Sequence, residues 1–345
     1  MDTVTQVNQG SWMNSLVARL GGSKQPEGED EPGVLCPEDR AGSPRPLDRL
    51  SPAHSPCLPE PPFQASLVAD KYLLLEQVEG SSLCRCVDVR TQHEYVCKVV
   101  GRECSALLAA HYRLDAQPHV NPLHEVLVGD KHTYLVFPRA HGDLHSHVRA
   151  RKRLREPEAR RLFRQMAETV RACHDHGIVL RDLKLRKFVF ADSQRTTLKL
   201  ESLEDAVVLE KSTDDLLQDK RGCPAYVSPE ILRAHHTYSG KAADMWSLGV
   251  ILYTMLVGRY PFNDSEHASL FAKISRGFFV VPESLSSRAK CLIRSLLRRD
   301  PSERLGADEV LSHPWLAQPE RPEPPRSRSP DQCVPQVQLP RDLYL

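Results

Sequence analysis

The sequence predicts an α+β protein with two lobes, a small β-rich lobe followed by a larger helical one. Four short runs rich in Val, Leu, Tyr and Cys, with turn residues between them, indicate strands over 72–78, 84–89, 94–100 and 131–138. After Pro138 the apolar residues recur at helical spacing instead. Ten of the 27 prolines lie in residues 1–65 and seven in residues 319–345, so the ends read as tails.

These shifts in composition divide the chain into three parts. Residues 1–65 are rich in Pro and Ser and poor in aromatic residues, so they are expected to be disordered, since they bury too little apolar area to offset chain entropy. Residues 66–318 are enough for a large core and form the expected folded domain. Residues 319–345 form a second disordered tail.

Three helices stand out in the second lobe. The first opens at Glu156-Pro157, carries one apolar face and stops at Gly177, as the positions of proline and glycine indicate. Residues 244–257 are almost all apolar, which predicts a buried helix. Residues 286–299 repeat the amphipathic spacing, and Pro301 ends them. Ligands often bind where two such lobes meet.

Charge and composition exclude several classes of protein. The chain has 46 basic and 45 acidic residues, a net charge of +1, which argues against a general electrostatic grip on nucleic acid or anionic membrane. The longest apolar run, around residues 248–258, is too short to span a bilayer, and the N-terminus does not read as a signal peptide. Ten cysteines without a CxxC pair predict a reducing location and no metal site.

Segments in the second lobe resemble, in order, the landmarks of protein kinases. They are 180–187 (LRDLKLRK), 222–230 (GCPAYVSPE), 244–250 (DMWSLGV), 298–305 (RRDPSERL) and 313–315 (HPW). The resemblance implies a bilobal protein-kinase-like fold. It also implies a structural ion pair between Glu230, at the end of the activation segment, and Arg304.

The positions that would hold ATP depart from the kinase pattern. Kinase glycine loops let the backbone approach the phosphates, but the three matching positions here hold Glu79, Ser81 and Cys84. Lys98 resembles the phosphate-pairing lysine, with a solvated strand lysine as the alternative. The helix after it should supply a glutamate, yet residues 104–124 contain none, so that helix is expected to be short or displaced.

The positions that would hold magnesium are also changed. The Asn of the catalytic loop is replaced by Lys187, and the D-F-G triplet reads Ser202, Leu203 and Glu204. Glu201, Glu204 and Asp205 lie in or beside this triplet and remain candidate cation ligands at altered geometry. Losing one charge-stabilising group typically lowers an enzyme's rate by ~10²–10³. We therefore expect no useful phosphotransfer, with weak or no ATP binding and no gain from magnesium.

Two residues of the catalytic loop keep their kinase identity. Asp182 stands where kinases have the base that accepts a substrate proton, and Lys184 follows it at the usual spacing. An aspartate at this position can also brace the loop through hydrogen bonds. We favour the structural role and interpret Asp182 and Lys184 as vestiges of a catalytic site.

These departures resemble those of the Tribbles pseudokinases. The resemblance covers roughly residues 72–315 and rests on LESLED (200–205), GCPAYVSPEIL (222–232) and YSGKAADMWSLGV (238–250). It implies a scaffold that binds C/EBP-type transcription factors and signalling kinases and brings them to a RING-type E3 ubiquitin ligase. It also implies AKT-type kinases as partners, and a location in the nucleus and cytoplasm.

The C-terminal tail resembles the family's docking peptide for the constitutive-photomorphogenic E3 ligase. The matching residues are Asp331, Gln332, Val334 and Pro335, of which Val-Pro would fill an apolar pocket. The family also docks MAP-kinase kinases around its last helix, which implies a role for His313, Pro314 and Trp315. Ser312 and Ala317 depart from that second pattern. The basic run 149–155 suits an acidic partner, an import receptor or simply a solvated helix end.

Two alternative functions stay open at this point. One is a slow, metal-independent Ser/Thr kinase that uses Lys98 and Asp182. The other is a kinase-inhibiting decoy that occupies its partners without any ligase.

Overall fold

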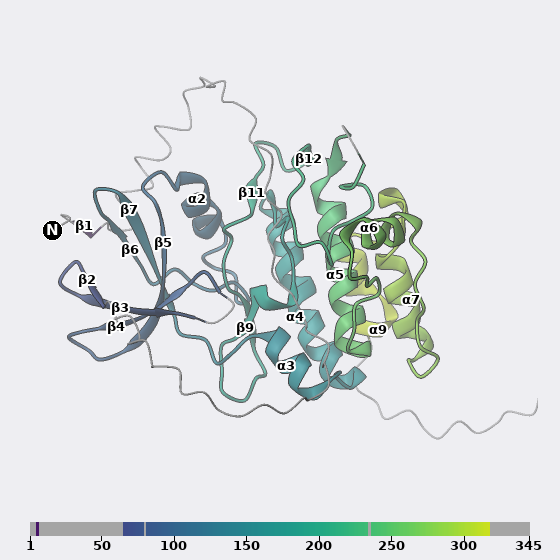
Figure 1. The fold of residues 1–345 in the computed structure, drawn as a ribbon, viewed down its shortest axis with the longest axis horizontal. Helices are drawn as coiled ribbons and strands as arrows, with labels where there is room; N and C mark the ends of the chain where they lie inside the picture. Colours follow the sequence, from purple (N-terminus) through teal and green to yellow (C-terminus); the bar gives the residue numbers. More distant parts are fainter. Residues whose placement is uncertain (1–4, 7–64, 79–80, 234–235, 318–345) are drawn as a thin grey trace, which may run out of the picture.

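The computed structural model describes residues 5–6, 65–78, 81–233 and 236–317. Its β-rich and helical lobes lie side by side along the long axis of the molecule (Figure 1), as the sequence predicts. The described helices include none that is both long and apolar enough to cross a membrane.

One antiparallel sheet forms most of the N-terminal lobe, in the order β1-β6-β7-β5-β4-β3-β2. Its strands are β1 (Thr5–Gln6), β2 (Ser66–Val68), β3 (Tyr72–Gln77), β4 (Cys84–Asp88), β5 (Glu94–Gly101), β6 (Glu125–Val128) and β7 (His132–Pro138). The four predicted strands are β3, β4, β5 and β7, each within one residue of its expected ends. Sequence reasoning missed β2 and β6, which are too short to show a clear alternation.

The edge strand β1 lies inside the stretch expected to be disordered. Thr5 and Gln6 pair with Val128 and Leu127 of β6. An edge strand offers unpaired backbone N–H and C=O groups, and pairing with them needs no apolar side chain. Hydropathy therefore gives no warning of such a strand.

Helix α2 (Ser105–Arg113) lies between β5 and β6 in the chain and contains nine residues. The helix is short, in keeping with the expectation, and carries no acidic residue. Its residues Leu108 and His111 are buried, and the centroid of the His111 ring lies 5.2 Å from that of Phe137 in β7. The helix is therefore fixed by packing against the sheet.

The C-terminal lobe is helical. Its helices are α3 (Leu144–Arg151), α4 (Glu156–Asp175), α5 (Gly240–Val257), α6 (His267–Arg276), α7 (Ser287–Leu296), α8 (Ala307–Ser312) and α9 (Pro314–Ala317). Short elements connect them: β8 (Ile178–Val179), η1 (Leu185–Lys187), β9 (Phe188–Phe190), β10 (Leu198–Leu200), β11 (Val207–Val208), β12 (Leu216–Leu217), β13 (Tyr238–Ser239) and η2 (Pro301–Glu303).

The ends of the predicted helices follow their caps. Helix α5 starts four residues before its apolar run, because the Ser239 hydroxyl accepts a hydrogen bond from the Ala242 N–H at 3.1 Å. It ends at Gly258, whose φ of +82° is the left-handed conformation that glycine adopts without strain. Helix α7 ends at Leu296, three residues short of the predicted end, since the chain turns there towards η2.

The core of this lobe surrounds α5. Fifteen of its eighteen residues are buried, with Trp246 stacked on Phe262 at 5.6 Å between ring centroids. Helix α4 packs against α5 and buries its predicted apolar face. Burial of apolar surface stabilises a fold by about 25 cal/mol per Å², so the contact between these two helices contributes to the stability of the helical lobe.

Candidate functional site

The kinase-like cleft lies between the two lobes, and its central loop is held by a buried carboxylate. Asp244 of α5 accepts hydrogen bonds from the backbone N–H groups of Leu180 and Arg181 at 2.8 and 2.9 Å. Its third contact, with His174 Nε2, measures 2.9 Å. These bonds hold Arg181 at a φ of +60°, a conformation that costs energy outside glycine. The loop that carries Asp182 is therefore held in place by Asp244 of α5.

Lys98 has an acidic partner that does not come from α2. Its side chain is 6% exposed, and Nζ lies 2.7 Å from Oε2 of Glu204. Glu204 is the last residue of the triplet that replaces D-F-G, 106 positions away in the sequence. The solvated-lysine alternative is therefore wrong, because Lys98 is buried and paired.

Lys187 is paired in the same way. Its Nζ lies 2.8 Å from Oδ2 of Asp205. Burial acts to raise the pKa of Asp205, but the charge and hydrogen bond of Lys187, together with the charges of Lys184 and Arg181, lower the pKa overall. The carboxylate therefore stays ionised and neutralises the cation that replaced a magnesium ligand.

Asp182 and Lys184 form an ion pair with each other. The Asp182 carboxylate contacts Lys184 Nζ at 2.8 Å and accepts a hydrogen bond from the backbone N–H of Cys223 at 3.2 Å. Burial acts to lower the pKa of Lys184, but the hydrogen bond and charge of Asp182 raise it overall. Asp182 thus links the catalytic loop to the activation segment, as the structural role requires.

The loop between β3 and β4 contacts the acidic residues in and beside the triplet that replaces D-F-G. Ser81 Oγ donates to Glu201 at 3.3 Å, and Ser82 Oγ donates to Glu204 at 3.1 Å. Burial is the main reason that the pKa of Glu201 is raised, although Lys187 and Ser81 oppose it. Cys84 is half-buried in β4 opposite Cys97 of β5. The remaining glycine-loop position, Glu79, lies outside the described residues.

The first two residues of the triplet that replaces D-F-G are buried. Ser202 is buried, and its Oγ accepts a hydrogen bond from the backbone N–H of Glu204 at 3.2 Å. Leu203 is 2% exposed and belongs to the core of the helical lobe. The carboxylates of Glu204 and Asp205 point to lysines, and within the described ranges no three His, Cys, Asp or Glu residues gather as a metal site would need.

A small cavity remains beside these ion pairs. Its volume is about 210 Å³, below the roughly 300–1,000 Å³ of typical small-molecule sites. Val78, Val96 and Val189 give it apolar walls, while Arg139 and Arg186 are among its polar ones. The phosphate side of a nucleotide would have to displace Glu204 and Asp205 from their lysines.

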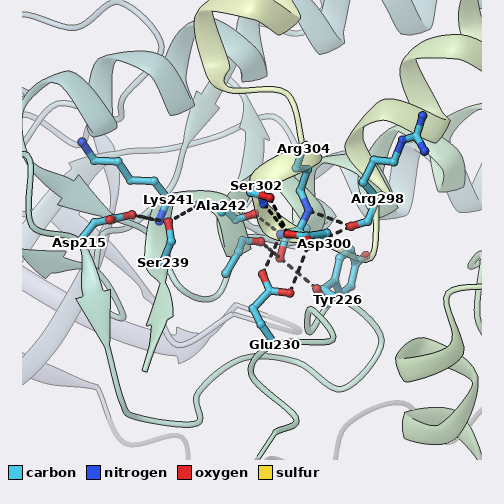
Figure 2. Close-up of polar contacts among 12 residues, drawn as sticks. Asp215, Tyr226, Glu230, Ser239, Lys241, Ala242, Arg298, Asp300, Ser302 and Arg304 are labelled. Carbon is cyan, nitrogen blue, oxygen red and sulfur yellow. Dashed lines mark hydrogen bonds and ion pairs between the residues drawn. The ribbon is translucent and has the colours of Figure 1, made fainter. Parts of the chain in front are cut away.

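The activation segment is held by two ion pairs. Asp219 pairs with Arg181 of the catalytic loop, and its backbone oxygen accepts from the Tyr238 hydroxyl at 2.7 Å. At the end of the segment, Glu230 and Arg304 form the expected ion pair, which is bidentate, with N···O distances of 2.7 and 3.1 Å. Figure 2 shows Arg304 reaching Glu230 and two backbone oxygens at once.

Comparisons with known proteins agree with this architecture. Residues 76–316 match the family described as the protein kinase domain. Tribbles homolog 2 of Bos taurus is 56% identical over 266 residues, which cover 76% of this chain and 77% of the relative. Tribbles homolog 3 of Mus musculus is 52% identical over 316 residues, covering 90% and 86%, and Tribbles homolog 1 of Homo sapiens is 49% identical over 314 residues, covering 86% and 84%.

The chain belongs to the Tribbles family. Homologs 1, 2 and 3 all match at 46–57% identity, so the matches place it in the family without selecting one branch. Membership implies a pseudokinase adaptor at the level of the family.

The residues of this Tribbles protein that were predicted to contact MAP-kinase kinases differ in exposure. Trp315 is fully buried, packs edge-on against Phe163 and donates to Glu156 Oε2 at 3.0 Å. In this conformation it is a core residue, while Pro314 is exposed and His313 half-buried. The tail motif 331–335 lies outside the described residues.

Sequence reasoning missed the internal partners of the Tribbles cleft. It considered Glu204 and Asp205 as substitute metal ligands, whereas the structure turns both towards lysines. One signal was available: the lysine at the magnesium position is opposite in charge to the two acids at the last position of the triplet and directly after it. The braces at Asp219 and Asp244 gave no comparable signal, since each partner lies far away in the sequence.

Proposed function

We propose that this protein is a pseudokinase scaffold that binds transcription factors and signalling kinases and recruits an E3 ubiquitin ligase through its C-terminal tail. The observation that carries the first part is the pairing of Lys98 with Glu204 and of Lys187 with Asp205. The two cations that would meet phosphates are already neutralised by the protein itself. A cleft of this kind favours a role in holding proteins over phosphoryl transfer.

The second part rests on family membership and the tail sequence. Residues 331–335 (DQCVP) resemble the family's docking peptide for the constitutive-photomorphogenic ligase. A substrate held on the folded domain and a ligase held by the tail meet at high effective concentration, even when each contact is weak. C/EBP-type factors, MAP-kinase kinases and AKT-type kinases are the proposed substrates and partners, in the nucleus and cytoplasm.

A pull-down with the full chain tests the adaptor role. The ligase's β-propeller domain should be captured by the unmodified chain and lost with Val334→Ala/Pro335→Ala. The matched control is Val337→Ala/Pro340→Ala, which removes the same residue types a few positions later. Capture that survives the first pair, or falls equally with the control, would refute docking through this motif.

One alternative, slow kinase activity, is favoured by the retained contact of Asp182 with Lys184 at 2.8 Å. It predicts phosphate turnover by purified protein without magnesium, abolished by Asp182→Ala. The decoy alternative predicts that a chain ending at residue 330 still inhibits its partner kinase. The scaffold proposal predicts no turnover, and loss of substrate degradation on that truncation.

We also propose weak or absent ATP binding that magnesium does not improve. The support is that three carboxylates of the cleft, those of Asp182, Glu204 and Asp205, are engaged by lysines. A thermal-shift titration should give the same small response to ATP with and without magnesium. A clear magnesium-dependent stabilisation would contradict this reading of Lys187 and Ser202.

A further inference from the structure

A second hollow lies in the helical lobe, away from the cleft between the lobes. Its volume is about 620 Å³, and it lies between the end of α6, the end of α7 and η2. We call it the Phe278 groove and define it by Arg233, Phe278, Arg294, Arg298, Arg299 and Asp300. Neither the kinase-like chemistry nor the tail motif makes use of it.

Apolar side chains are exposed on the segment after α6, which lines the Phe278 groove through Phe278 and Phe279. After α6 the burial alternates, with Phe279 and Val281 facing the core and Phe278 and Val280 facing solvent. Phe278 is 86% exposed and Val280 74% exposed. A single exposed apolar residue needs no explanation, but two neighbours beside a hollow mark a candidate contact surface.

This edge is held in place by its inward residues. The Phe279 ring packs edge-on against Tyr253 and Phe262, with centroids 6.0 and 5.7 Å apart. The Tyr253 hydroxyl donates to the backbone oxygen of Val280 at 2.8 Å. The exposed ring of Phe278 is therefore presented by an anchored segment, which lowers the entropy cost of binding.

The rest of the groove is positively charged. Four arginines line it against two acids, Asp300 and Glu303. Asp300 is engaged in capping η2, where it accepts from the Ser302 N–H and hydroxyl at 2.9 and 2.8 Å. Glu303 lies 3.8 Å from Arg298.

The remaining arginines of the groove, Arg233, Arg294 and Arg299, are exposed and form no ion pair with any residue that the structure describes. A binding partner can therefore reach them without first breaking an internal salt bridge.

The loop that carries Arg298 is held by hydrogen bonds to Arg304. Arg304 lies directly behind the loop of Arg298 and Asp300, and donates to the Arg298 backbone oxygen at 3.0 and 3.2 Å (Figure 2). The same guanidinium is locked to Glu230. The backbone at Arg298 is thus tied to a buried ion pair.

We propose that the Phe278 groove docks an acidic peptide segment of a partner protein. An apolar side chain of that peptide packs on Phe278 and Val280, while its carboxylates contact Arg233, Arg294 and Arg299. A second copy of the chain is a poorer occupant, because a two-fold contact through this face sets one arginine cluster against the other. The acidic stretch 27–39 of this chain has the right composition and is the competing occupant that the experiment must separate.

A random 16-residue peptide library, displayed and selected on the full-length protein, tests the proposal. Selected peptides should be rich in Asp and Glu around an aromatic or aliphatic residue. Their affinity should fall at least about tenfold with Phe278→Ser, as for a central aromatic anchor, and similarly with Arg294→Glu/Arg299→Glu. Binding should also weaken as salt rises from 0.1 to 0.5 M, because exposed charges are screened.

Matched controls separate the groove from general effects. Leu67→Ser removes another exposed apolar side chain, in β2, and Arg90→Glu/Arg161→Glu reverses two exposed arginines elsewhere. Both controls should bind the peptides like the unmodified chain. Thermal melting should show that Phe278→Ser remains folded, since its side chain is exposed.

Three outcomes would overturn the proposal. The first is the absence of any selected peptide whose binding depends on Phe278 or the arginines. The second is peptide binding that requires removal of residues 1–64, together with binding of a synthetic 26–40 peptide to that shortened chain, which would make the chain's own segment the occupant. The third is self-association that Phe278→Ser abolishes. None of these results depends on ligase capture by the tail.

Discussion

Replacing Arg304 by methionine should destabilise the helical lobe strongly. The Arg304 side chain is fully buried and that of Glu230 is 6% exposed. Methionine has a similar length but no charge, so Glu230 would be left as a buried carboxylate without a cation. The backbone oxygens of Ala242 and Arg298 would also lose their donor.

The expected magnitude follows from this burial. Removing one partner of a buried ion pair typically costs about 3–5 kcal/mol, because an uncompensated charge remains. For a domain of this size, one kcal/mol lowers the melting temperature by roughly 2–4 °C, so a fall on the order of 10 °C is expected. Urea unfolding followed by circular dichroism and by tryptophan fluorescence would measure it, since Trp246 lies 5.3 Å from the Arg304 guanidinium.

Two further variants make this prediction refutable. Arg298→Met removes only an exposed contact with Glu303 at 3.8 Å and should cost less than about 1 kcal/mol. Arg304→Met combined with Glu230→Leu removes both charges and should recover much of the loss. If Arg304→Met costs no more than Arg298→Met, or if the double variant is no more stable than the single one, the argument from an unpaired buried charge fails.

Three other substitutions carry predictions. Glu204→Gln should free the buried lysine of β5 and strengthen magnesium-independent ATP binding by about three- to tenfold in a thermal-shift titration, whereas the exposed control Glu210→Gln should change nothing. His111→Leu should flatten the pH dependence of unfolding: burial lowers the pKa of His111 from 6.5 to about 4, so the unfolded chain takes up this proton first, and stability falls as pH drops from 6.5 towards 4. At pH 5 the difference is about 2 kcal/mol, and an unaltered pH profile in the variant would contradict this. Asp219→Asn should loosen the activation segment by weakening its pair with Arg181, seen as faster hydrogen exchange over residues 215–225; unchanged exchange would show that other contacts suffice.

Local pattern predicted most of the folded elements. The alternation in β3, β4, β5 and β7 and the apolar faces of α4 and α7 are properties of neighbouring residues, so they can be read without knowing the fold. Cap residues refined the ends only partly: Pro157 and Gly177 fit their predicted places, while the Ser239 cap moved the start of α5. Strands whose pairing depends on backbone groups alone, such as β1, left no pattern to detect.

The candidate site was also predicted only in part. The kinase landmarks located the cleft positions in the sequence, and the replacement of both magnesium ligands, by Lys187 and Ser202, followed from residue identity alone. The partner of Lys98 was not visible, because it is supplied from 106 residues away and only the folded chain brings the two together. The sequence suggested that charge at the cleft had changed, but not that the new charges neutralise one another.

The amino-acid order by itself determined the family, the two lobes and the changed residues of the cleft, since each can be recognised from short contiguous segments. Only the tertiary structure decided that Trp315 is a core side chain, that Glu204 and Asp205 pair with lysines, and that Phe278 lines a groove together with four arginines. The physical reason is that burial and charge pairing depend on the distance in space between side chains, and distance along the chain does not fix it.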